Sequence, residues 1–231
     1  MTSNRVYVVA GSKPWNRRIF DEVIATYPGQ WYFIATADEL TVERLATMRP
    51  RFIFFLHWSW KVPAAVVDHY ECVCFHMTDV PYGRGGSPLQ HLILAGHHHT
   101  TLTALRMTNE IDAGPVYLKE RLELEGSAED IYIRASSLAA AMVRRLIHEP
   151  ITPIPQTGEP VIFRRRKPQD SRIRVLPDVQ SLYDFIRMLD AEGYPRAFLE
   201  HGGFRYEFSR AALRDGSIEA NVSIVPKGRP A

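Results

Sequence analysis

Short apolar runs alternate with segments of helical spacing along the first two thirds of the chain. Runs rich in β-branched and aromatic residues predict buried strands, and they lie at 5–10, 31–35, 52–56, 72–76, 100–107 and 115–124. Apolar residues spaced three and four apart predict helices between these strands, at 16–27, 41–48, 63–69 and 87–95. This alternation predicts an α/β fold, a Rossmann-like, mostly parallel twisted sheet with helices on both faces.

A longer helix is predicted to follow residue 127. Ser127 and Asp130 stand where the two polar members of a capping box belong, although the second is an aspartate rather than Glu or Gln. Apolar residues then recur at helical spacing, at Ile131, Ala135, Leu138, Met142 and Leu146.

The composition changes near residue 150. The stretch ITPIPQTGEP (151–160) contains three prolines and is typical of a linker or a crossing strand. Beyond it we predict a basic strand, a helix and short strands, at 161–166, 181–189, around Phe198 and at 204–208. The expected division is a catalytic domain at 1–150 and a small C-terminal α+β subdomain at 151–231.

Composition and charge narrow the classes of function. Apolar residues make up 45% of the 231 residues, which is enough for a core, and the formal net charge is only +2. We therefore expect no nucleic-acid partner. No stretch has the apolar length of a membrane span, and Cys72 and Cys74 are too close together on one strand for a disulfide. The expectation is a cytoplasmic protein without a membrane partner, and a homodimer is left open.

Polar residues follow several predicted strands. Ligands of open parallel sheets bind beyond the carboxyl ends of the strands, so segments 11–16, 57–60 and 109–112 should meet near His76. This would gather His57, His76 and Asp112. A histidine beside a carboxylate suits acid–base work or stabilisation of an oxyanion. A strand-end histidine with a purely structural role is the alternative.

Two other kinds of site are weaker alternatives. Cys72, Cys74 and His76 alternate onto one strand face and are zinc-ligand types, but zinc ligands usually come in wider-spaced pairs, so no metal is expected. The glycine-rich stretch GRGG (83–86) could cradle a phosphate or simply form a turn. We favour the turn.

The stretches HMTDVPYGRGGSPLQHLILAG (76–96), HHHTTLTALRM (97–107) and EIDAGPVYLK (110–119) together resemble the folate-dependent formyltransferases. That family carries an N-x-H loop with a following P-x-x-R-G, a T-G-x-T strand and a D-x-G turn. The matching positions are His76, Pro81, Arg84, Gly85, Pro88, Gly96, Thr100, Thr103, Asp112 and Gly114.

The resemblance implies an N-formyltransferase that uses N10-formyltetrahydrofolate as co-substrate. Segments 163–173 and 186–198 resemble the region after the catalytic domain in nucleotide-sugar N-formyltransferases, so a nucleotide-linked amino sugar is the expected acceptor. Another small amine is the alternative, for example a ribonucleotide, an amino acid or an aminoacyl group. A catalytically impaired binding relative is a further alternative.

The resemblance also implies roles for residues. His76, as imidazolium, would stabilise the oxyanion, and Asp112 would keep it charged and help to move the proton lost by the amine. His57 would lie near the formyl group. The expected folate contacts are Trp58, Ser59, Trp60, Met107, Asn109, Glu110 and Ile111. The expected substrate contacts are Lys13, Asn16, Thr78, Asp79 and Arg84.

Cys74 departs from the family pattern. It occupies the position of the asparagine that supplies a second oxyanion donor in the family. A thiol is a weak donor, and loss of one such donor costs about 10²–10³ in rate in enzymes that rely on it. Another group (His57, Thr78 or Asn109) would then replace it, or catalysis would be weak.

Overall fold

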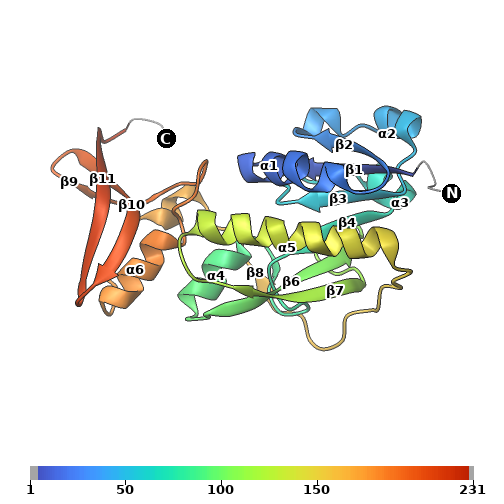
Figure 1. Cartoon of the computed structure of the whole chain (residues 1–231). Helices are drawn as coiled ribbons and strands as arrows, with labels where there is room; N and C mark the ends of the chain where they lie inside the picture. Colours follow the sequence, from blue (N-terminus) through green and yellow to red (C-terminus); the bar gives the residue numbers. More distant parts are fainter. Residues whose placement is uncertain (1–4, 229–231) are drawn as a thin grey trace. The chain divides into compact units, whose positions relative to one another are not determined.

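The computed structural model of the chain describes residues 5–228 (Figure 1). It contains two compact units that interleave along the sequence. The first comprises Met1–Gly85, Thr100–Leu122 and Ile133–Ile162, and the second comprises Gly86–His99, Glu123–Tyr132 and Phe163–Ala231. The division at residue 150 remains a prediction, because these units do not meet at a single point in the sequence.

A six-stranded sheet of order β2-β1-β3-β4-β6-β7 forms the centre of the first unit. β1, β2, β3 and β4 are mutually parallel where they pair, and β6 runs antiparallel to β4. The strands are β1 (Val6–Gly11), β2 (Gln30–Ile34), β3 (Phe52–Leu56), β4 (Cys72–His76), β6 (His99–Arg106) and β7 (Val116–Glu123). The predicted α/β class with a mostly parallel sheet is confirmed.

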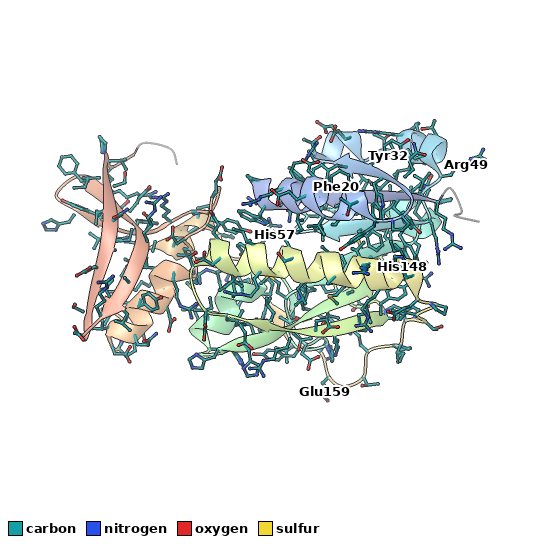
Figure 2. The ribbon with its side chains drawn as sticks, viewed as in Figure 1. Phe20, Tyr32, Arg49, His57, His148 and Glu159 are labelled. Atoms are coloured by element: carbon teal, nitrogen blue, oxygen red, sulfur yellow. The ribbon has the colours of Figure 1, made fainter. Side chains whose placement is uncertain are left out.

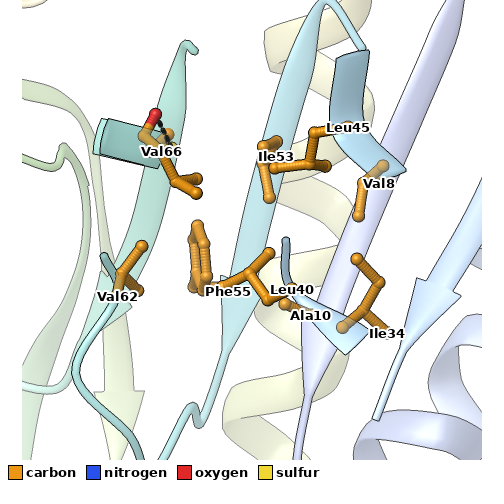
Figure 3. Close-up of a cluster of buried hydrophobic side chains, with 10 residues drawn as sticks. Val8, Ala10, Ile34, Leu40, Leu45, Ile53, Phe55, Val62 and Val66 are labelled. Carbon is orange, nitrogen blue, oxygen red and sulfur yellow. Dashed lines mark hydrogen bonds between the residues drawn. The ribbon is translucent and has the colours of Figure 1, made fainter. Parts of the chain in front are cut away.

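One face of this sheet is covered by α2 (Val42–Met48) and α3 (Ala64–His69). Leu45 of α2 and Val66 of α3 are fully buried against Ile53 and Phe55 of β3 (Figure 3). Alternate residues of a strand point to the same face, so the apolar run of β3 supplies both faces at once. The rest of this buried cluster consists of Val8, Ala10, Ile34, Leu40, Val62 and Cys72.

Aromatic rings fill the opposite face. Trp31 stacks on both Tyr7 and Phe54, and Phe54 contacts Phe75 of β4. The helix α1 (Pro14–Glu22) lies on this face, because its Phe20 contacts Phe33 at a ring-centroid distance of 5.0 Å. Two short 3-10 turns, η1 (Ile24–Thr26) and η2 (Ala37–Glu39), complete the connections around β2. Helices therefore cover both faces of the sheet.

The predicted capping box at the start of α5 (Ala128–His148) is confirmed. The Asp130 carboxylate accepts from the Ser127 backbone N–H at 2.9 Å, and the Ser127 hydroxyl accepts from the Asp130 N–H at 3.2 Å. Each residue satisfies a backbone donor that the first helical turn leaves without a partner.

The second unit contains α4 (Pro88–Leu94), the 3-10 turn η3 (Pro168–Ser171), α6 (Val179–Arg187) and a three-stranded sheet of order β11-β10-β9. Its strands are β9 (Ala197–His201), β10 (Phe204–Arg214) and β11 (Ser217–Pro226). The antiparallel hairpin of β10 and β11 is longer than predicted, since we expected neither β11 nor the second half of β10.

The basic strand predicted at 161–166 is wrong in extent. Only β8 (Ile162–Phe163) is a strand, and it pairs with β5 (Arg84–Gly85) in a small two-stranded sheet. The arginines that follow belong to a loop, in which Arg164 and Arg165 are exposed and Arg166 is half-buried. Within residues 5–228, no helix has the length and apolarity to cross a bilayer.

Candidate active site

His76 ends β4 at the carboxyl edge of the parallel strands, and its ring is buried. Its Nε2 donates to the carbonyl of Gly83 at 2.7 Å, and the buried Thr78 hydroxyl donates to the same carbonyl at 3.3 Å. The Thr103 hydroxyl on the neighbouring β6 donates to the Thr78 carbonyl at 2.7 Å. The loop that follows β4 is thus fastened back onto the sheet, and it holds one ring nitrogen of His76.

Asp112 faces the other ring nitrogen. Its Oδ2 lies 3.6 Å from Nδ1 of His76 and accepts from the Gly85 N–H at 2.9 Å. Asp112 has a φ of 52°, a left-handed conformation that Asp tolerates better than most residues. At Gly114 a Cβ would lie 1.8 Å from the Arg106 carbonyl, so only glycine fits there. The D-x-G pattern therefore describes a turn whose geometry brings a carboxylate to His76.

Cys74 lies on β4 close to this pair and is half-buried. Burial and, secondarily, the Asp112 carboxylate raise the pKa of its thiol well above the usual value. The group is therefore a neutral thiol at physiological pH. It can offer only a weak S–H donor where the family pattern has an amide.

The HWSW segment (57–60) begins directly after β3. His57 has a φ of 51° and packs edge-on against Trp15 at a ring-centroid distance of 5.7 Å. Burial, aided by the charge of Lys13, lowers the pKa of His57 to about 3, so its imidazole is neutral at physiological pH. Figure 2 labels His57 on the first unit. The Ser12 hydroxyl donates to the His57 carbonyl and bonds to the Ser59 hydroxyl, both at 2.9 Å.

Two tryptophans of the same segment contact one another. Trp58 packs against Phe55 of the core, and its ring lies 5.0 Å from the ring of Trp60, which is 45% exposed. The Nε1 atom of Trp58 is buried without a hydrogen-bond partner. The Trp58 ring is therefore held by packing against Phe55 and Trp60, and the Trp60 ring supplies the exposed aromatic surface of this segment.

The residues predicted for the other side of the folate lie on the loop after β6. The backbone N–H of Met107 donates to the Cys72 carbonyl at 2.8 Å, which ties the start of this loop to β4. Asn109 donates to Asp68 at 2.9 Å, and Glu110 faces Arg84 at 3.5 Å. Ile111 is 71% exposed and directly precedes Asp112. The loop therefore presents an apolar side chain next to the candidate acid–base pair.

The two candidates in segment 11–16 differ in their surroundings. Asn16 is completely buried, accepts from the Lys13 N–H at 3.2 Å and donates to Ser136 of α5 at 3.2 Å. These contacts suit a residue that holds the start of α1, more than one that contacts a substrate. Lys13 lies close enough to His57 to influence its charge.

The contacts of Asp79 and Arg84 also lie within the protein. The exposed carboxylate of Asp79 pairs with Lys119 of β7 at 2.5 Å. The guanidinium of Arg84, whose side chain is only 13% exposed, donates from Nε and Nη2 to Oε1 of Gln156 at 3.0 and 2.8 Å. The glycine-rich stretch thus forms a turn with an internal partner. The binding roles predicted for Asp79, Arg84 and Thr78 remain predictions.

Gln156 is the site residue that the sequence analysis missed. It lies in the proline-containing stretch 151–160, where no periodicity or motif marks it. Its partners are distant in sequence, so only the folded chain shows its place. Among residues 5–228, no group of three or more His, Cys, Asp or Glu side chains is arranged to hold a metal ion.

Comparison with known proteins places these features in a family. A family profile described as "Methionyl-tRNA formyltransferase, C-terminal domain" matches residues 168–225. A methionyl-tRNA formyltransferase of Methylobacterium nodulans is 28% identical over 180 residues, which are 72% of this chain and 57% of that protein. The chain spans about half the length of the curated relatives it matches.

Solved structures extend the comparison to nearly the whole chain. A structure named as methionyl-tRNA formyltransferase from Clostridium thermocellum is 41% identical, with a TM-score of 0.91, and the match covers 96% of this chain and 99% of that one. A 4-N formyltransferase from Francisella tularensis shares the fold at 16% identity, with a TM-score of 0.65 and coverage of 96% and 97%.

The relatives differ in how closely they resemble this chain. The proteins named as methionyl-tRNA formyltransferases are similar in sequence, at 28% and 41% identity, whereas the Francisella enzyme is similar only in fold. The motifs, the His76–Asp112 pair and the similarity over nearly the whole chain agree, and the chain belongs to the formyltransferase family.

Proposed function

We propose that this protein transfers a formyl group from N10-formyltetrahydrofolate to the primary amine of an aminoacyl group. The observation that carries the proposal is the His76–Asp112 pair at the carboxyl edge of the sheet, with a separation of 3.6 Å. Family membership supports the reaction class, and the names of the relatives support the aminoacyl acceptor.

The residues around the pair suit a folate. Trp58 and Trp60 offer aromatic surface on one loop, and the exposed Ile111 offers apolar surface on another. Flat heteroaromatic rings favour such apolar and aromatic walls. The folate supplies an electrophilic formyl carbon, and the protein supplies its orientation.

The hydrogen bond from Nε2 to Gly83 determines which nitrogen of His76 is available. Because Nε2 donates to a carbonyl, it carries a proton in both charge states of the ring. Nδ1 is therefore the atom that gains or loses a proton, and at 3.6 Å it makes no short hydrogen bond to Asp112. We assign Nδ1 as the catalytic atom of His76.

The proposed reaction is an acyl transfer at the formyl carbon. A bond forms between the amine nitrogen and the formyl carbon, and the bond from that carbon to N10 breaks. Protonated Nδ1 donates to the oxygen that becomes negative, while the Asp112 carboxylate stabilises the imidazolium. The proton lost by the amine ends on N10 of the leaving group, and we assign Asp112 as its relay.

The test uses purified protein, N10-formyltetrahydrofolate and matched acceptors. Methionyl-tRNA, methionine methyl ester and a set of nucleotide-linked amino sugars would be supplied in separate reactions. Mass spectrometry would detect a product heavier by one formyl group, and we expect it with an aminoacyl acceptor. Formylation of an amino sugar alone would overturn the acceptor, and the absence of any product with tight folate binding would indicate an impaired relative.

A further inference from the structure

Gln156 uses every hydrogen-bonding position of its side-chain amide within the first unit. Its Nε2 donates to the backbone carbonyls of Asp112 and Gly114, both at 2.8 Å. Its Oε1 accepts both bonds from the Arg84 guanidinium. A single half-buried amide thus joins the turn that carries Asp112 to the loop that follows β4.

Both of these segments hold His76. The loop supplies the Gly83 carbonyl that binds Nε2, and the turn supplies the carboxylate that faces Nδ1. Gly85 of the loop also donates to that carboxylate. The distance between Nδ1 and Oδ2 therefore depends on how these two segments are fixed to each other, and the Gln156 side chain contacts both.

The backbone around Gln156 is itself anchored. Ile154 and Val116 exchange two backbone hydrogen bonds of 2.7 and 2.8 Å. Further along, the Val161 N–H donates to the Pro81 carbonyl at 3.1 Å, and the Val161 carbonyl accepts from Arg84 at 3.0 Å. These contacts attach the segment to β7 on one side and to the loop after β4 on the other, so the Gln156 amide has a defined position.

We propose that Gln156 is a positioning residue that sets the separation of His76 and Asp112 and so determines the rate of formyl transfer. This inference rests on the proposed function for its catalytic consequence. Without the amide, the carbonyls of Asp112 and Gly114 would lose their donors and the Arg84 guanidinium would lose its acceptor. Small displacements of reacting groups are costly, with about 10²-fold in rate for roughly 1 Å.

The experiment compares Gln156→Leu and Gln156→Glu with Glu159→Gln. Leucine removes all four hydrogen bonds, whereas glutamate keeps an acceptor for Arg84 and loses both donors. Glu159 projects from the same segment without contacting the pair and is labelled in Figure 2, so its variant is the matched control. We expect kcat to fall at least about 10-fold in both Gln156 variants, with each KM within about 3-fold of wild type.

A second readout does not require activity. The reaction of each histidine with diethyl pyrocarbonate at pH 7 would be followed by peptide mass spectrometry. We expect the rate at His76 to rise at least about 5-fold in both Gln156 variants, because loss of the anchor exposes a buried ring. His57, on a different loop of the same unit, should keep its wild-type rate and serves as the internal reference.

The outcomes separate the alternatives. Faster reaction at both histidines would indicate general loosening and would overturn a positioning role, as would unchanged kcat and unchanged His76 reactivity. If the leucine variant does not fold, the glutamate variant decides. If the wild-type protein transfers no formyl group, the proposed function fails, while the reactivity of His76 still tests whether Gln156 holds it in place.

Discussion

Oδ2 of Asp112 lies 3.6 Å from Nδ1 of His76, near enough for an ion pair and too far for a direct hydrogen bond. The opposite nitrogen of the same ring is held by the Gly83 carbonyl at 2.7 Å. The ring is therefore fixed on one side and open on the other. Because of this asymmetry, Nδ1 of His76 can exchange a proton while the bond from Nε2 keeps the ring in its orientation.

The first prediction concerns the two members of this pair. His76→Ala and Asp112→Asn should each lower kcat by at least about 10², because each removes a group that acts on charge in the transition state. Initial rates with N10-formyltetrahydrofolate and the acceptor that the formylation test selects would measure the effect. Circular dichroism and the melting temperature serve as controls for the fold. Near-full activity of either variant would contradict the assigned roles.

Cys74→Asn tests whether the Cys74 thiol lowers kcat because it is a weak hydrogen-bond donor to the oxyanion. The neutral thiol is a weak donor, and an amide at this position would restore the donor of the family pattern. We expect kcat to rise, by up to about 10²-fold. Cys74→Ala, which removes the thiol and adds no donor, is the control. A lower kcat in the asparagine variant would show that the oxyanion site has been rebuilt around another group.

The depressed pKa of His57 predicts acid sensitivity. The folded protein keeps this imidazole neutral down to about pH 3, whereas the unfolded chain binds a proton below its ordinary value of 6.5. The unfolded state thus binds more protons between these values, so stability is complete above pH 6.5 and falls as the pH drops through this window. The loss from this group should be about 2 kcal/mol between pH 6.5 and pH 5.

His57→Asn removes this titration and tolerates the left-handed backbone better than most residues. Urea unfolding at pH 6.5 and pH 5 should show a smaller loss of unfolding free energy in the variant than in the wild type. Between pH 9 and pH 8 the two proteins should respond alike, because His57 titrates in neither state. An equal loss of unfolding free energy in the variant and the wild type between pH 6.5 and pH 5 would contradict a neutral His57 imidazole in the folded protein.

Trp60→Ala tests the aromatic surface. The ring is 45% exposed and contacts Trp58, so its removal should change the melting temperature little. Aromatic contacts are worth about 0.5–1.5 kcal/mol beyond their area, which predicts a folate Kd about 3- to 10-fold higher. Isothermal titration with tetrahydrofolate would measure it. Val161→Ala, another exposed apolar truncation of the first unit, should leave the Kd unchanged.

Local sequence patterns determined several of the helices and strands. The predicted strands at 52–56 and 72–76 agree with β3 and β4 residue for residue, because uninterrupted apolar runs can be buried on both faces only inside a sheet. The start of α5 was also predictable from local sequence. Ser127 and Asp130 each accept a hydrogen bond from the backbone N–H of the other within one helical turn. The resemblance to formyltransferases marked His76 and Asp112.

Tertiary structure alone decided the connections between these elements. β11 alternates apolar and polar residues weakly, and its place depends on pairing with β10, for example Val222 with Phe208. Gln156 bonds to a turn and a loop far away in sequence, and no periodicity encodes such partners. Periodicity reports which face of one element is buried, whereas hydrogen bonds between distant loops depend on where the whole chain brings them together.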